Sequence, residues 1–184
     1  MKNRIRKSNK LKRSLMDGTE VIAKSREASK IFLASEMYKN AKCIMLYMPL
    51  GKETDTVEIM DRAFVDGKRL VFPVTDSHSG EITPYYTEKD TVFQKGAFSV
   101  MEPCRAEIAD IVNVDVILVP GIAFSENGTR VGFGKGCYDR ILKNTDAVKV
   151  GFCYEFQVCD EIVGEKHDVK MNYIVTECGI RKCL

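Results

Sequence analysis

Glycines alternate with other residues in one segment of the chain, in a pattern suited to binding phosphate. Gly132, Gly134 and Gly136 enclose Phe133 and Lys135. Glycine allows the backbone to adopt a positive φ and to approach a ligand closely. Successive backbone N–H groups followed by the first turn of a helix favour an anion. The pattern therefore predicts an anion-binding turn, and the alternative is a tight structural turn that carries a solvated lysine.

Two cations stand in or near this glycine turn. Lys135 adds a mobile positive charge, and Arg130 adds a planar guanidinium that can bind two phosphate oxygens at once. Two familiar phosphate motifs do not fit the segment. A P-loop needs glycine at Thr129 and Ser or Thr at Gly136, and the dinucleotide fingerprint needs glycine at Cys137. The turn is therefore a phosphate-binding candidate of another kind.

The elements that must position this turn alternate along the chain. Apolar segments, of which residues 43–48 are a continuous run, predict strands at residues 43–48, 70–74, 82–86, 114–119, 148–154 and 173–176. Amphipathic spacing and capping residues predict helices at residues 2–16, 19–39, 55–65, 138–143 and 156–162. Residues 93–102 are expected to form a loop that crosses the molecule. This order predicts one α/β domain over residues 1–184, with three α/β/α layers and a mostly parallel sheet. Ligands bind past the carboxyl ends of the strands in such sheets, which is where the glycine turn begins.

Composition and charge limit the classes of function. The chain has 184 residues, of which 45% are hydrophobic, and this content suits one compact domain. Its 28 basic and 26 acidic residues give a net charge of +2, which does not favour nucleic-acid binding by the whole molecule. The apolar runs are too short to span a bilayer, and the charged N-terminus does not resemble a signal peptide. Seven scattered cysteines predict free thiols in a reducing cytoplasm.

The basic residues are concentrated in the N-terminal segment. They are Lys2, Arg4, Arg6, Lys7, Lys10, Lys12 and Arg13, and all of them precede the first acidic residue. Three interpretations stay open for this segment: a solvated helix face, a phosphate-binding arm within the same domain, or a nucleic-acid contact.

The glycine turn resembles the signature of a known family. Pro120-Gly-Ile-Ala-Phe124, followed by Gly-Thr-Arg-Val-Gly-Phe-Gly-Lys-Gly-Cys-Tyr-Asp-Arg140, is similar to that of the 5-formyltetrahydrofolate cyclo-ligases. The resemblance extends over most of the chain, through Lys2-Asn-Arg-Ile-Arg6, Tyr47-Met-Pro-Leu-Gly-Lys-Glu53-Thr-Asp-Thr56, Glu102-Pro103, Gln157 and His167-Asp168. The chain departs from the family at three positions. The family usually has Asp at the position of Ser125, Arg or Tyr at that of Phe133, and Tyr at that of Cys137.

This resemblance implies an enzyme that converts 5-formyltetrahydrofolate to 5,10-methenyltetrahydrofolate with ATP, through a phosphorylated formyl intermediate, and releases ADP and phosphate. It implies Lys135 and Tyr138 as catalytic residues, and Asp139 and Asp168 as ligands of Mg²⁺. It implies an ATP site formed by Lys2, Asn3, Arg4, Ile5, Arg6, Arg130, Val131, Gly132, Phe133, Gly134, Lys135, Gly136, Cys137 and Tyr138. It implies a folate site formed by Met48, Glu53, Phe133, Gly134, Lys135, Gly136 and Cys137.

Several alternatives stay open beside this reading. Met48 could be a core residue, Glu53 a surface acid and Asp168 an ordinary loop aspartate. The fold class would also suit a phosphosugar isomerase or a CoA-transferase-like enzyme, and residues 2–13 could serve a nucleic-acid-binding module. The reading we favour expects ATP and 5-formyltetrahydrofolate as small-molecule partners of a cytoplasmic monomer, with no nucleic acid and no membrane.

Overall fold

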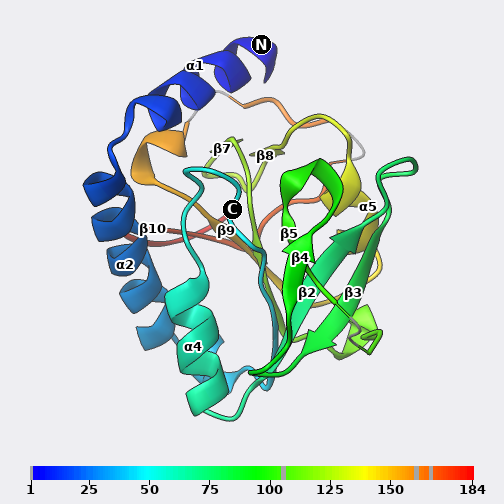
Figure 1. The fold of residues 1–184 in the computed structure, drawn as a ribbon. Helices are drawn as coiled ribbons and strands as arrows, with labels where there is room; N and C mark the ends of the chain where they lie inside the picture. Colours follow the sequence, from blue (N-terminus) through cyan, green and yellow to red (C-terminus); the bar gives the residue numbers. More distant parts are fainter. Residues whose placement is uncertain (1, 105–106, 160–161, 166–167) are drawn as a thin grey trace.

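The computed structural model describes residues 2–104, 107–159, 162–165 and 168–184 (Figure 1). The strands of its main sheet are β1 (Cys43–Met45), β2 (Arg69–Thr75), β3 (Ile82–Thr87), β6 (Val116–Val119), β9 (Val148–Phe152), β10 (Tyr173–Thr176) and β11 (Gly179–Lys182). They form a seven-stranded sheet in the order β11-β10-β9-β6-β1-β2-β3. Neighbouring strands from β10 to β2 are parallel, whereas β3 and β11 pair antiparallel at the two edges. The predicted mostly parallel sheet is confirmed.

Helices cover both faces of this sheet. They are α2 (Gly18–Ala34), α3 (Glu36–Asn40) and α4 (Val57–Val65) on one face, and α5 (Cys137–Leu142) on the other. Successive residues of a strand point to opposite faces, so Ile44 packs with Phe32 of α2 and Met45 packs with Ile141 of α5. The core therefore has one layer of buried side chains on each face, and the predicted three-layer α/β/α arrangement is confirmed.

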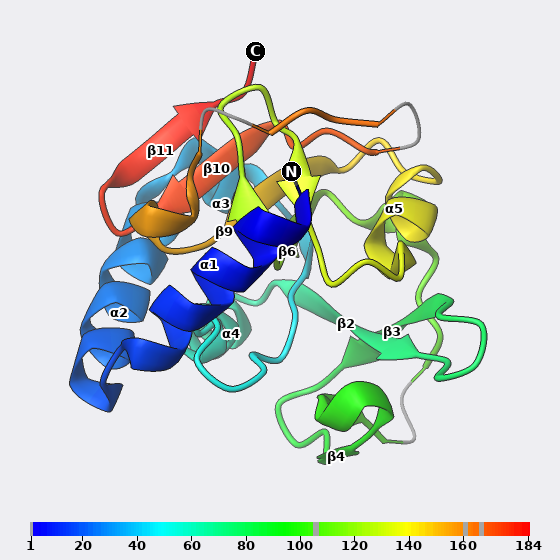
Figure 2. The ribbon, with the colours of Figure 1, turned by 90° about the horizontal axis from the view of Figure 1, so that it is seen from above.

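The first helix, α1 (Lys2–Leu15), does not belong to either layer. Its one buried side chain is Asn9, whose Nδ2 donates a hydrogen bond to the carbonyl of Ile122, 3.1 Å away, just beyond β6. Figure 2 shows α1 lying across the central strands when the fold is seen from above. The helix thus covers the edge of the sheet from which the segment after β6 emerges.

Four segments differ from their predicted structure. The helix predicted over 19–39 is divided into α2 and α3 at Ser35, because this residue caps both: its N–H donates to the Phe32 carbonyl and its Oγ accepts from the Tyr38 N–H. The loop predicted over 93–102 is a hairpin of β4 (Phe93–Lys95) and β5 (Met101–Pro103), joined through a 3₁₀ turn.

The other two differences lie near the C-terminus. In place of the helix predicted over 156–162, the structure has a short 3₁₀ turn, Glu155–Gln157. Residues 160–161 of the predicted helix lie outside the described part of the chain. Val158 and Cys159 leave the helical path because they pair with Phe124. Strand β11 was not predicted, since its side chains are only partly covered and carry little of the apolar pattern of a buried strand.

The strand order reverses between β1 and β6. From β1 the chain continues to β2 on one side, whereas β6, β9 and β10 follow on the other side. Ligands bind past the carboxyl ends of the strands at such a reversal point. The two segments that leave these ends are residues 46–56 and residues 120–136, which hold the family-like segments identified in the sequence. The topology therefore brings them to one edge.

The cysteines and the helices bear on two further predictions. All seven cysteines lie in the described part of the chain, and all are free thiols. Among the described residues, no helix has both the length and the apolar composition required to cross a bilayer.

Candidate active site

The turn after β6 is an ordered structure rather than an open loop. Its first part forms a short antiparallel pair, β7 (Ala123–Phe124) with β8 (Arg130–Val131). The chain then passes from Gly132 to Gly136 and enters α5. The pair and the helix fix both ends of the glycine turn, so its backbone is held in place before any ligand binds.

The three glycines of the turn are required for two different reasons. Gly134 has φ +99° and Gly136 has φ +66°, values that L side chains rarely adopt. At Gly132 the constraint is space, because a Cβ atom there would lie 2.7 Å from Nη1 of Arg130. The predicted positive φ is thus found at two of the glycines, and the third allows an arginine to approach.

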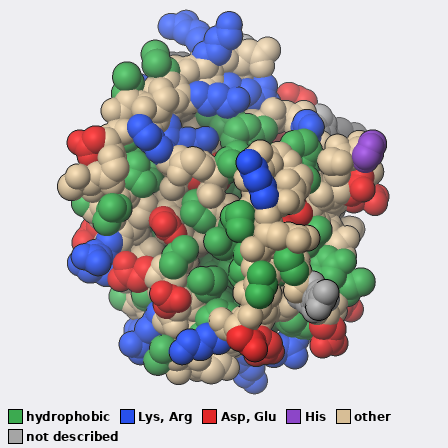
Figure 3. Space-filling view, viewed as in Figure 1, with side chains coloured by type: hydrophobic (Ala, Val, Ile, Leu, Met, Phe, Trp, Pro, Cys, Tyr) green, Lys and Arg blue, Asp and Glu red, His purple; other side chains and the backbone are tan. Residues whose placement is uncertain are grey.

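Helix α1 packs directly on this glycine turn. Nε of Arg6 donates to the carbonyl of Gly132 at 2.9 Å, across 126 residues of sequence. Nζ of Lys10 lies 5.0 Å from the centre of the Phe133 ring. Figure 3 shows Lys and Arg side chains at the top of the molecule, where Figure 1 places α1. The structure therefore joins the N-terminal basic segment and the glycine turn into one positively charged surface.

Arg130 lies beneath that surface. Its side chain is 6% exposed, and its Nη2 forms an ion pair of 2.9 Å with Oδ2 of Asp139. The guanidinium also lies 5.7 Å from the centre of the Tyr138 ring. Nε of Arg130 is buried and has no hydrogen-bond partner among the described residues. Arg130 thus carries spare donor capacity at the base of the glycine turn.

Asp139 and Asp168 are brought close to each other. Oδ1 of Asp139 accepts from the N–H of Val169 at 3.4 Å, so it lies beside the backbone next to Asp168. Oδ2 of Asp168 accepts from Nζ of Lys2 at 2.9 Å and from the N–H of Glu165 at 2.8 Å. Although burial opposes the shift, the hydrogen bonds to Glu165 and Asp168 raise the pKa of Lys2. The site therefore places carboxylates and cations side by side.

The donor set at this place suits a hard cation. Among the described residues, no group of three or more His, Cys, Asp or Glu side chains could hold a metal ion. Mg²⁺ usually takes only one or two protein carboxylates and completes its shell with water and phosphate oxygens. Asp139 and Asp168 supply oxygen donors of the kind that Mg²⁺ takes, and in the structure they form ion pairs with Arg130 and Lys2. His167 of the family-like segment lies outside the described residues.

Glu53 and Met48 follow β1 at the same edge of the sheet. Glu53 is buried, which excludes the alternative that it is a surface acid. Its Oε2 accepts from the N–H of Leu50 at 2.9 Å. Burial raises the pKa of Glu53, and the Leu50 N–H and the charge of Arg13 oppose that rise. Met48 is partly buried and packs against the core beneath α2, as the alternative of a core residue expects.

Tyr138 lies between the glycine turn and Glu53. Burial raises the pKa of its hydroxyl, and the negative charge of Glu53 raises it further. The hydroxyl therefore stays protonated at neutral pH and can act as a hydrogen-bond donor. In this place it can stabilise negative charge but cannot serve as a base.

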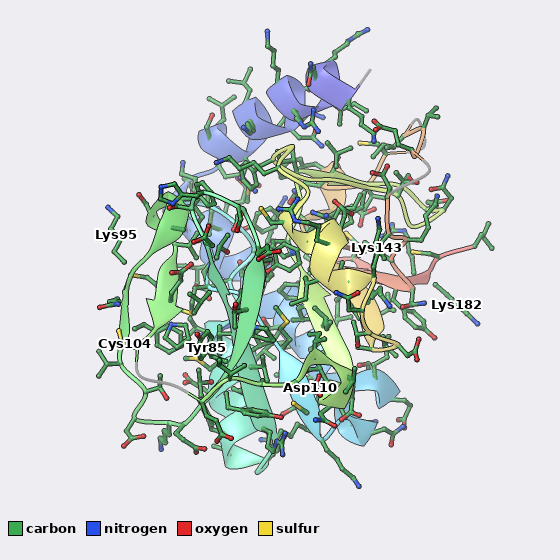
Figure 4. The ribbon with its side chains drawn as sticks, turned by 90° about the vertical axis from the view of Figure 1, so that its right-hand side faces the viewer. Tyr85, Lys95, Cys104, Asp110, Lys143 and Lys182 are labelled. Carbon is green, nitrogen blue, oxygen red and sulfur yellow. The ribbon has the colours of Figure 1, made fainter. Side chains whose placement is uncertain are left out.

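Sequence reasoning missed two neighbours of Lys135. Nζ of Lys135 lies 3.8 Å from the centre of the Phe98 ring, and Phe98 has a φ of +55° in the 3₁₀ turn between β4 and β5. Figure 4 shows that hairpin at one edge of the molecule, marked by Lys95 and Cys104. The only sequence signal for Phe98 was an aromatic residue within a segment that we expected to be a loop.

The second neighbour is Arg140 of α5. Its Nη1 donates to the Lys135 carbonyl at 3.0 Å, and its Nη2 donates to the Gly80 carbonyl at 2.7 Å. Arg140 thus fastens the glycine turn to the β2–β3 connection. Its position at the end of the signature was visible in the sequence, but its partner near Gly80 was not.

Comparison with known proteins identifies the family of the chain. The profile of the 5-formyltetrahydrofolate cyclo-ligase family matches residues 1–177. The 5-formyltetrahydrofolate cyclo-ligase of Saccharomyces cerevisiae is 32% identical over 167 residues, which cover 76% of this chain and 77% of that protein. The Mus musculus protein of the same name is 27% identical over 158 residues, covering 79% of this chain and 78% of that protein.

A solved structure extends the likeness to the whole fold. The NMR structure of Aquifex aeolicus 5,10-methenyltetrahydrofolate synthetase is similar with a TM-score of 0.87 and 32% sequence identity. The similarity covers 98% of this chain and 92% of that one. The match of the family profile over almost the entire chain, together with these relatives, shows that the chain belongs to the 5-formyltetrahydrofolate cyclo-ligase family.

Proposed function

We propose that the chain catalyses the ATP-dependent cyclisation of 5-formyltetrahydrofolate to 5,10-methenyltetrahydrofolate, with release of ADP and phosphate, and that residues 1–184 act as one catalytic domain. The observation that carries this proposal is the packing of Arg6 on the Gly132 carbonyl. This contact makes one basic surface from α1 and the glycine turn, next to the carboxylates of Asp139 and Asp168. A nucleoside triphosphate with its metal ion has the charge pattern that such a surface complements.

The chemistry requires an activated formyl oxygen, since that oxygen is a poor leaving group. In the proposed reaction the γ-phosphoryl group of ATP moves to the formyl oxygen, and ADP leaves. N10 of the folate then attacks the formyl carbon, and the C–O bond breaks as phosphate departs with its electron pair. Loss of the N10 proton leaves the methenyl product. Positioning and charge neutralisation carry most of a phosphoryl transfer, so the protein needs few covalent roles.

The described residues can be assigned to these needs. We assign Lys135 to neutralise the migrating phosphoryl group, because it is exposed between two glycines of the turn. Lys2, Arg6 and Arg130 would clamp the triphosphate, while the glycine-turn N–H groups hold its oxygens. Tyr138, with its raised pKa, would donate a hydrogen bond to developing negative charge.

The folate and the metal ion would lie on two sides of these groups. Glu53 and Met48 would contact the folate from the segment after β1, and the exposed ring of Phe133 would face it from the glycine turn. Asp139 and Asp168 would hold Mg²⁺, which when bound would supply positive charge to the phosphate oxygens.

The activity can be tested directly. Mixing the protein with MgCl₂, ATP and 5-formyltetrahydrofolate should produce the absorbance of the methenyl product together with an equal amount of phosphate. A protein that forms neither product, with or without ATP, would contradict the proposal. A phosphosugar isomerase or a CoA-transferase-like enzyme would instead convert a sugar phosphate or an acyl-CoA without consuming ATP.

A further prediction concerns the two carboxylates. Asp139→Asn and Asp168→Asn should each raise the Mg²⁺ concentration for half-maximal activity by about tenfold or more, since changes even to the outer shell of a metal site cost about 10–100-fold in metal affinity or activity. The double variant should have less than the sum of the two effects on free energy, because both residues act on one ion. The measurement is a Mg²⁺ titration of activity at fixed ATP.

Asp146→Asn is the matched control, since this aspartate is exposed between α5 and β9. An unchanged Mg²⁺ midpoint in Asp168→Asn would limit Asp168 to its contacts with Lys2 and Glu165. The same result for Asp139→Asn would limit Asp139 to its ion pair with Arg130.

A further inference from the structure

The C-terminal end of α1 is attached to the segment that follows β1. Nη1 of Arg13 lies 3.5 Å from Oε1 of Glu53, and the two side chains are only 12% and 7% exposed. Beside them, Nζ of Lys52 donates to the carbonyls of Ser14 and Met16 at the end of α1. Two cations, one from each side, thus join α1 to the segment that carries Glu53.

Among the groups around Glu53, Arg13 is the positively charged partner of its carboxylate. Among the described residues, the titratable groups beside Glu53 are Arg13 of α1, Tyr47 beyond β1, Tyr138 of α5, and Tyr154, whose hydroxyl donates a hydrogen bond to the Glu53 carbonyl. Tyr47 is buried and Tyr138 is partly buried, and burial raises the pKa of each hydroxyl. A buried carboxylate loses hydration and is protonated more easily unless a cation or hydrogen bonds compensate. Of these groups, Arg13 supplies the cation.

The backbone of Glu53 is held separately from its carboxylate. Its carbonyl accepts from the Tyr154 hydroxyl at 3.2 Å, and Oε2 accepts from the N–H of Leu50. The segment would therefore keep much of its path if Arg13 were changed. Arg13 contributes a positive charge beside Oε1, whereas the Leu50 N–H binds only Oε2.

We propose that Arg13 is a positioning residue for the folate substrate: it keeps Glu53 ionised and aims its carboxylate at the N–H donors of the folate ring. A carboxylate accepts hydrogen bonds from two neighbouring N–H groups only when it is ionised and correctly oriented. The proposal rests on the proposed function, which places Glu53 in the folate site, and goes beyond it by naming the group that maintains Glu53 in its binding form.

The test compares Arg13→Gln with Arg13→Lys and with the control Lys12→Gln. Arg13→Gln should raise the KM for 5-formyltetrahydrofolate by about five- to tenfold, the scale of one partly buried charge contact. The KM for ATP and the kcat at saturating folate should change by less than about twofold. Arg13→Lys should recover part of the loss. Lys12→Gln removes the same charge from an exposed position of the same turn and should leave all three constants unchanged.

The pH profile separates this role from a structural one. Glu53 accepts hydrogen bonds from folate only above its pKa, so the folate KM should rise as the pH falls through that pKa. Arg13 opposes the rise of the Glu53 pKa, and its removal therefore raises that pKa further. In Arg13→Gln the increase in folate KM should begin at a higher pH than in the unchanged enzyme. A loss of packing alone would leave the midpoint where it is.

Glu53→Gln distinguishes failure of this inference from failure of the folate site. If Glu53→Gln keeps the normal folate KM, the placement of Glu53 in the folate site is wrong. If Glu53→Gln raises that KM but Arg13→Gln changes neither the KM nor the pH midpoint, the inference about Arg13 is overturned. If Arg13 acts through Glu53, the double variant should be no weaker in folate binding than Glu53→Gln alone.

Discussion

Replacing Lys135 with alanine should lower kcat by about a hundredfold or more, because phosphoryl transfer would lose a cation close to its developing charge. Lys135 is exposed and stands between Gly134 and Gly136, so its removal does not open the core. The contact that is lost within the protein is the one between Nζ and the ring of Phe98. A cation–π contact at an exposed site contributes about 0.5–1 kcal/mol, so the free energy of unfolding should change little.

Three measurements define the result for Lys135→Ala. The kcat is obtained from product absorbance at saturating ATP and folate, folate affinity from an equilibrium titration, and stability from denaturant unfolding. Lys143→Ala is the matched control, since Lys143 is exposed directly after α5 and away from the glycine turn. A kcat within about twofold of the unchanged enzyme would remove Lys135 from the mechanism.

The double variant Lys2→Ala/Arg6→Ala should weaken ATP binding by one to two orders of magnitude. Hydrogen bonds to charged groups contribute about 1.5–3 kcal/mol each, and about 1.4 kcal/mol corresponds to tenfold in affinity. Part of the effect is offset, since both side chains already have partners: Lys2 binds Asp168 and Arg6 binds the Gly132 carbonyl. Folate affinity should change less, because Glu53, the proposed charged contact of the folate, lies beside Arg13 at the other end of α1.

The control for this variant removes two positive charges from the same helix. Lys7→Ala/Lys12→Ala changes exposed positions and keeps the net charge equal to that of the test variant. Both proteins are compared by equilibrium titration with ATP at two salt concentrations, since screening weakens exposed charges more than buried ones. Equal ATP affinity in Lys2→Ala/Arg6→Ala and the unchanged protein would assign the N-terminal basic segment to a solvated helix face.

The parallel core of the fold could be predicted from the sequence. The segments that become β1, β6, β9 and β10 are rich in apolar residues, as expected for strands of a parallel sheet that is covered on both faces. The glycine turn could also be located, since the positive φ found at Gly134 and Gly136 favours glycine over other residue types. These features depend on local sequence, and the structure confirms them.

The remaining parts of the site depend on contacts between distant segments. The pairing of Arg13 with Glu53, the approach of Phe98 to Lys135 and the link of Arg140 to Gly80 each join residues far apart in the chain. A single sequence gives no direct signal for such pairs. The prediction of one continuous helix across Ser35 failed for another reason. Serine can end one helix and cap the next, and the helical pattern on either side conceals the change.

The polar attachment of α1 has a consequence for how the enzyme responds to heat and salt. Asn9 is its buried side chain and Ile5 is only partly buried. Its other described contacts to the fold are mostly polar: hydrogen bonds, ion pairs and the cation–π contact of Lys10 with Phe133. Elements that bury little apolar surface open with a smaller free energy than the core does. Warming or added salt should therefore detach α1 while the sheet stays folded, so that the proposed nucleotide site would be lost before the fold. A triphosphate that contacts both α1 and the glycine turn would bind only the attached form, and would therefore raise the temperature at which α1 detaches.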